Sequence, residues 1–210
     1  MKKHLETIFG VLRRALLATV TAILLFGPTV SLAATNTATW DISGTGQTDA
    51  TFTLNSYDNT QISLTKTAFL VTGGSELTSG DSVPSGTLVD FMIIVSNENT
   101  NPVSNINIVD VLDDTIFTYS TGNMRINATN TCAALACTQA ERQALYNNAV
   151  AINDAIDADV GGYEANTPAA GSTRVSAGSG TGNGPLNVVG ATATPTAGED
   201  FALVFRVTVQ

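Results

Sequence analysis

The chain has 210 residues with nine Lys and Arg against 18 Asp and Glu, a formal net charge of −9, and only 13% charged residues, about half the fraction of an average soluble domain. Its one histidine is His4, so the chain beyond the N-terminus cannot support His-dependent catalysis or His-ligated zinc. Nucleic acid and anionic lipid are also poor partners, because they bind clustered Lys and Arg, and the basic residues beyond position 14 are scattered.

Residues 1–33 have the pattern of a secretory signal peptide. Four basic residues lie within the first 14 positions, Ala15 to Phe26 is an apolar run of twelve, and Ser31-Leu32-Ala33 supplies small residues for cleavage. A retained membrane anchor is the alternative, but a bilayer span needs about 20 residues. We therefore expect a secreted protein cut after Ala33, associated with the membrane only through its export signal. This product keeps five basic and 17 acidic residues, a net charge of −12, and no histidine.

Residues 34–61 form an N-terminal extension in front of the main domain. Ala38, Trp40 and Ile42 alternate with polar residues, as in a β-strand with one apolar face. Such a strand could insert into the sheet of a neighbouring subunit, where backbone hydrogen bonds and side-chain pockets would bind it. The alternative is that it pairs within its own subunit. The three apolar residues are our candidates for a polymerisation strand.

Residues 62–210 read as a single domain of short strands. The sequence after Ala33 contains 27 threonines, many of them alternating with apolar residues, as in strands with a hydroxylated outer face. The clearest alternation runs from Leu88 to Asn97, with Val89, Phe91, Ile93 and Val95 facing one way. Further strands are expected from Ile106 onward and at the C-terminus, where Leu203, Phe205, Val207 and Val209 alternate. The pattern predicts an all-β fold, an Ig-like antiparallel β-sandwich.

Cys132 and Cys137 are the only cysteines. Because an exported protein meets an oxidising compartment and the count is even, we expect a disulfide that pins a local loop. The alternative is a redox-active pair, although the C-x4-C spacing is not a C-x-x-C motif and no basic neighbour would lower a thiol pKa.

One inserted amphipathic helix is expected over about 138–160. Thr138 and Glu141 have the spacing of a capping box. An apolar stripe at helical spacing follows, and Gly161-Gly162 comes after it. The stripe consists of Leu145, Ala149, Ile152 and Ile156. The Gly- and Ser-rich residues 171–184 are expected to form a mobile loop, because they offer little apolar surface to offset the entropy of ordering.

Three segments resemble a known family. The sequences LTKTA at 64–68, VPSGTLVDFMIIVSN at 83–97 and INIVDVL at 106–112 are similar to the bacterial "conserved repeat" Ig-like domain of cell-surface proteins, the domain-of-unknown-function eleven type. There a Lys-Thr strand, a Gly-Asp-x-Val-x-Tyr-x-Ile-x-Val-x-Asn strand and a Val-x-Asp-x-Leu-Pro strand follow one another. The match covers residues 62 to about 119; Asp113 replaces the usual proline, and the 138–160 helix is not part of the pattern. The resemblance implies an exported structural or adhesive module of a bacterial surface, here in single copy.

Acidic residues gather in two places, one around Asp110 and Asp113 and the other at Asp154, Asp157 and Asp159. Negative charge near the end of the expected helix opposes its dipole, and a bound Ca²⁺ would relieve this through carboxylate and carbonyl oxygens. Neither group has a known calcium-loop spacing, so a solvated acidic surface is the alternative, and calcium is the one cofactor we consider. A pair of carboxylates is also what a glycosidase needs, but the sequence does not single out one pair among the acidic residues. The candidate calcium ligands are Asp154, Asp157, Asp159, Asp110 and Asp113.

Lys66 follows Ile62 and Leu64 at intervals of two residues along an expected strand, so its side chain should face the same, inward side. Two readings follow: a lysine that snorkels to the surface, or an internal Lys–Asn/Asp isopeptide bond, as in some surface sandwiches.

We therefore expect a non-enzymatic, exported subunit of a cell-surface or extracellular filament. It would polymerise with copies of itself by inserting its N-terminal strand into a neighbour. The alternative is a monomeric secreted adhesin or matrix-binding module that uses the helix or the 171–184 segment.

Overall fold

The computed structural model describes residues 33–42, 46–55, 62–98, 100–133, 136–190 and 199–210, of which 33–42, 46–49 and 52–55 are described by backbone alone. The chain divides into two units, Met1–Leu32 and Ala33–Gln210, and all of the described strands and helices belong to the second. The expected signal peptide, apart from Ala33, lies outside the described residues. In the part of the chain described, no helix is long and apolar enough to cross a membrane.

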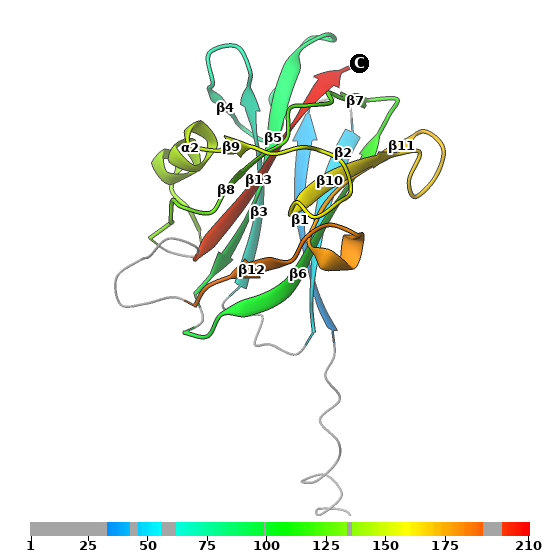
Figure 1. Cartoon of the computed structure of the whole chain (residues 1–210). Coiled ribbons are helices and arrows are strands. Elements are labelled where there is room, and N and C mark those ends of the chain that lie inside the picture. The colour runs from blue at the N-terminus through cyan, green and yellow to red at the C-terminus, as the bar shows by residue number, and fades with distance from the viewer. Residues whose placement is uncertain (1–32, 43–45, 56–61, 99, 134–135, 191–198) are drawn as a thin grey trace, which may run out of the picture. The chain divides into compact units, whose positions relative to one another are not determined.

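The second unit consists of two antiparallel sheets (Figure 1). In the first, the strands lie in the order β1 (Ala33–Ile42), β2 (Gly46–Asn55), β6 (Val103–Asp113), β11 (Ser172–Ala177) and β10 (Gly161–Ala165), and β12 (Leu186–Val188) also pairs with β6. In the second, the order is β4 (Glu76–Leu77), β3 (Ile62–Leu70), β5 (Leu88–Asn97), β13 (Asp200–Val209), β8 (Arg125–Asn127) and β9 (Val150–Ala151), and β7 (Phe117–Tyr119) pairs with β13. The prediction of an all-β sandwich is confirmed.

The main core lies between the two sheets. Because side chains alternate across a strand, β5 turns Val89, Phe91, Ile93 and Val95 into this core, and all four are fully buried. The sequence alternation had predicted this face. Apolar residues from β6 and β13 meet them from both sheets, and the ring of Phe91 packs edge-on against Phe117 with centroids 5.4 Å apart.

A second, smaller core covers the opposite face of β5. Met92 and Ile94 are fully buried there, under the helix α2 (Gln139–Asn147). The ring of Tyr146, on α2, stacks on Phe69 of β3 at 4.2 Å between centroids. The helix therefore forms a third layer on one side of the sandwich, and it buries the second face of β5.

The helix is shorter than the sequence predicted. The capping box is confirmed, because the Thr138 hydroxyl accepts from the Glu141 backbone and the Glu141 carboxylate accepts from the Thr138 backbone. The predicted end at residue 160 is wrong: the helix ends at Asn147, with Asn148 as its C-cap. The chain then forms β9, which bonds to β8. Hydrogen bonds between β9 and β8 thus take the place of the helical hydrogen bonds that the apolar spacing predicted.

The prediction of a mobile loop over 171–184 is also wrong. This segment contains β11, which pairs with β6, and a short 3-10 helix, η2 (Ser179–Thr181). Its glycines serve close packing: a Cβ on Gly178, which has a φ of 102°, would lie 1.9 Å from the Ile106 carbonyl oxygen. Val175 and Ala177 are fully buried in the main core. Small residues here let backbones approach, and the burial that this permits orders the segment.

Candidate functional site

The N-terminal extension forms a hairpin. Strand β1 pairs with β2 along all of its ten residues, with Ala38 opposite Ala50 and Trp40 opposite Thr48. Strand β2 in turn pairs with β6 through Ala50–Thr53. The backbone of the candidate polymerisation strand, Ala38, Trp40 and Ile42, therefore pairs within its own subunit in this chain, while the side chains of these three lie outside the described residues. Insertion into a neighbour stays a prediction.

The position of β1 matters for assembly. It stands at the end of the strand order of its sheet, as far as the chain is described. The outer side of such a strand presents a row of backbone N–H and C=O groups that can template pairing with another chain. The feature that the sequence suggested for polymerisation therefore lies at an edge of the sandwich.

Lys66 and Asp110 meet inside the sandwich. Lys66 is on β3 and Asp110 on β6, so the two come from opposite sheets. The Lys66 Nζ atom lies 2.7 Å from Asp110 Oδ2, and both side chains are 0% exposed. The same Nζ atom lies 4.7 Å from the centroid of the Phe91 ring. The reading of Lys66 as a snorkelling lysine is wrong, because its amine ends in the interior, at a carboxylate 44 residues away in sequence.

The candidate calcium ligands are spread over the fold. Asp110 is engaged with Lys66. Asp113 accepts from the backbone N–H and the hydroxyl of Thr115, at 2.9 and 2.6 Å, and these bonds lower the pKa of the Asp113 carboxyl. Asp154 accepts from the Tyr119 hydroxyl and the Gly122 backbone. Each of these three carboxylates is therefore engaged with different partners at a different place in the fold.

Two of the acidic residues do share a neighbour. The Asn153 side-chain amide donates to Asp157 at 3.1 Å and to Asp159 at 2.6 Å. Among the described residues, only one group of three or more metal-binding side chains converges, and it contains none of the predicted ligands. Calcium binding stays a prediction without a preformed set of carboxylates.

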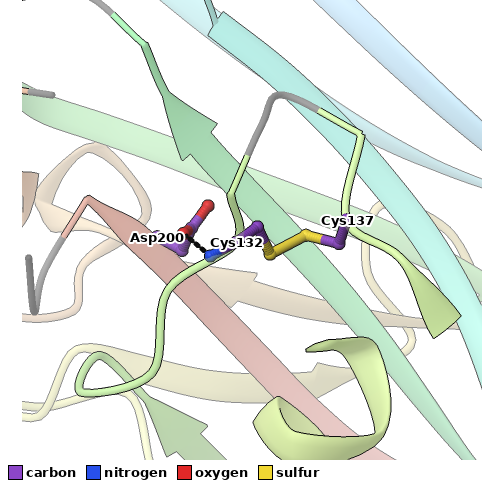
Figure 2. Close-up of side chains that lie close together, drawn as sticks. All are labelled: Cys132, Cys137 and Asp200. Carbon is purple, nitrogen blue, oxygen red and sulfur yellow. Dashed lines mark hydrogen bonds between the residues drawn. A yellow bond between two sulfur atoms is a disulfide. The ribbon is translucent and has the colours of Figure 1, made fainter. Parts of the chain in front are cut away.

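That converging group is Cys132, Cys137 and Asp200 (Figure 2). The two cysteines form the expected disulfide, with Cα atoms 5.0 Å apart, so their sulfur atoms are bonded to each other. The Asp200 carboxylate accepts from the Cys132 backbone at 2.5 Å, and burial raises the pKa of Asp200. The disulfide thus ties its loop to the start of β13.

A buried charge cluster centred on Asp90 was not predicted from the sequence. Its side chain is 1% exposed and accepts from Arg125, at 2.7 Å, and from Arg206, at 2.8 and 3.1 Å. The Tyr146 hydroxyl also donates to it, at 2.9 Å. Burial, and then the charge of Asp90, raise the pKa of Tyr146, while the bond to Asp90 raises the pKa of Arg206. This cluster joins β5, β8, β13 and α2.

Two surface hollows lie among the described residues. One, of about 410 Å³, lies beside α2, where the Arg142 guanidinium pairs with Glu76. It is lined mainly by hydroxyl and amide groups: Thr65, Thr67, Thr78, Ser79 and Gln139. The other, of about 310 Å³, lies against the stacked rings of Tyr119 and Tyr163, whose centroids are 4.2 Å apart. Burial, followed by the charge of Asp154, raises the pKa of Tyr119.

Comparison with known proteins finds no match. No family model matches the chain, and neither the search of curated proteins nor that of solved structures finds a similar one. The resemblance to the surface repeat domain therefore rests on the three sequence segments alone.

Proposed function

We propose that this protein is an exported, non-enzymatic subunit of a cell-surface or extracellular filament, which polymerises when β1 of one copy adds to the sheet of the next. The observation that carries the proposal is the place of β1: the strand begins at the expected cleavage site, and among the described strands it stands at an edge of its sheet. The signal pattern of residues 1–33 and the resemblance to bacterial surface modules support the location.

Exchange of β1 between copies has a low energetic cost. The strand forms a regular antiparallel ladder with β2, and the same ladder can form with β2 of a neighbour. Because a swapped strand replaces bonds of the same kind, domain swapping changes the free energy little. In a chain of copies, each would give its β1 and receive another, which is a head-to-tail contact that propagates as a fibre.

A reversible lock across the hairpin tests the proposal. Thr37 on β1 lies directly opposite Thr51 on β2, so the double variant Thr37→Cys/Thr51→Cys can form a cystine that holds β1 on its own subunit. We expect the oxidised variant to stay monomeric and the reduced variant to form filaments under the electron microscope. The controls are the single Thr37→Cys variant and wild-type protein with the same reductant, which also opens Cys132–Cys137.

Removal of the extension gives a second test. Deletion of residues 34–60 removes β1 and β2 and should yield soluble monomers, provided that the shortened chain keeps the circular dichroism of a folded sandwich. If filaments form in undiminished amount from the locked or the deleted protein, assembly does not proceed by exchange of β1 and the proposal is wrong.

The second candidate function is a monomeric adhesin or matrix-binding module. The hollow beside α2 favours it, because hydroxyl, amide and charged groups converge there, as they do in sites for polar ligands. This candidate predicts a monomer on size exclusion that binds immobilised oligosaccharides. Filling the hollow with Thr78→Tyr should abolish that binding, while Ser104→Tyr, an exposed substitution on β6 that lines neither hollow, should leave it unchanged.

A further inference from the structure

The Lys66–Asp110 pair crosses the interior of the sandwich. Lys66 lies opposite Ile93 in the β3–β5 ladder, and Asp110 lies between Ala50 of β2 and Val175 of β11. The Lys66 Nζ atom stands 2.7 Å from Asp110 Oδ2, with both side chains fully buried. An amine and a carboxyl group from two different sheets are thus held in contact by two rigid ladders.

Buried apolar side chains lie next to the pair. Ala50, Val175, Ile93 and Phe91 are all 0% exposed, and the Phe91 ring lies 4.7 Å from the Lys66 Nζ atom. Burial of charged groups in such a place is costly, and a buried ion pair roughly breaks even against an apolar pair of the same volume. Transfer of one proton from the ammonium to the carboxylate converts the pair into a neutral amine and a carboxylic acid, which the dry interior favours.

We propose that Lys66 and Asp110 condense to an intramolecular amide bond that joins β3 to β6. The neutral Nζ atom attacks Cγ of the protonated Asp110 carboxyl group, a C–N bond forms, and the carboxyl C–O bond breaks. The hydroxyl group leaves with one proton from the amine, so that the products are an amide and one water molecule. No oxidant, reductant or other reactant is needed.

Two features of the site drive this condensation. Reactants fixed in contact behave as if at an effective concentration of about 10⁵–10⁸ M, which offsets the tendency of water to hydrolyse amides. The buried apolar neighbours also disfavour a water molecule at this place, and with it the reverse hydrolysis. Because β3 and β6 belong to opposite sheets, the bond would tie the two sheets of the sandwich together covalently, which suits a protein that carries load, although the inference does not depend on polymerisation.

The intact mass of the protein, measured by mass spectrometry, tests whether the amide bond forms. The exported protein, denatured with its disulfide reduced, should have a mass lower by one water molecule than the sequence left after leader cleavage requires. Comparison with Lys66→Arg makes the result independent of where the leader is cut: the two proteins should differ by the Lys-to-Arg mass difference plus one water. Fragmentation of a protease digest should give a branched peptide that contains both Lys66 and Asp110.

The Asp110→Asn variant provides a chemical signature. An amide side chain would release ammonia instead of water, so this variant should be lighter than its sequence by one ammonia molecule, while Asp110→Ala should have its full mass. A wild-type protein with the full mass of its sequence, measured alone, overturns the proposal, and this result does not depend on whether any variant folds.

Discussion

The Asp90 cluster allows the sharpest test of how the helix and the second sheet are held together. Asp90→Asn removes one negative charge from a side chain that is 1% exposed and keeps its shape. The two guanidinium groups that donate to it are Arg125 and Arg206, and the Tyr146 hydroxyl is a further donor. An Asn at this place offers one acceptor oxygen and directs an NH₂ group at a cation.

The magnitude follows from the burial of the partners. Removal of one member of a buried ion pair costs roughly 3–5 kcal/mol, because the other charge stays buried without compensation. The side chains of Arg125 and Arg206 are 23% and 24% exposed, so water relieves part of this penalty. We therefore expect the lower end, a loss of about 3 kcal/mol in the free energy of unfolding.

Urea unfolding at neutral pH measures this loss, with circular dichroism as the signal. Glu164→Gln is the matched control, since Glu164 pairs with Arg174 but is 39% exposed, and an exposed pair contributes about 1 kcal/mol or less. If Asp90→Asn loses no more than the control, the cluster does not hold these elements together, and the reasoning from burial is wrong.

Three further outcomes follow from single contacts. Thr138→Ala removes the N-cap of α2 and should lower the free energy of unfolding by about 1 kcal/mol, which urea unfolding checks; no change would show that the cap is dispensable. Cys132→Ser/Cys137→Ser should stay folded and lose roughly 2 kcal/mol, because the loop closed is short; failure to fold would contradict a local role. Burial raises the pKa of Asp200 above 3.8, so folding favours its protonated form, and this stability is present below about pH 4 and lost as the pH rises through the folded pKa. Asp200→Asn should therefore lose less stability than wild type over that rise in pH, and parallel profiles from urea titrations would refute the assignment.

The strands were predictable because their signal is local. In β5 and β13, alternation of apolar residues marked the face that lies in the main core, and the capping box marked the start of α2. The opposite face of β5 was not foreseen as a core, since Met92 and Ile94 are buried only because α2 packs over them. Burial on that side depends on an element 45 or more residues away along the chain.

The errors in the site share the same cause. The inward phase of Lys66 was predictable from Ile62 and Leu64, but its meeting with Asp110 depends on how two sheets face each other. The helix was extended too far because Ile152 continues the helical spacing, whereas in the fold it packs against the main core. Gly178 read as a flexible loop residue, and only the close approach to the Ile106 carbonyl shows that it serves packing.

Assembly by strand exchange is tested most directly by the size of the exported protein itself. The full chain, expressed with its leader and purified from outside the cytoplasm, can be examined by size exclusion and electron microscopy over a range of concentrations. We expect filaments that disappear in the oxidised Thr37→Cys/Thr51→Cys variant and return on reduction. A wild-type protein that elutes as a monomer at every concentration, with no filaments on the grid, would contradict the proposal.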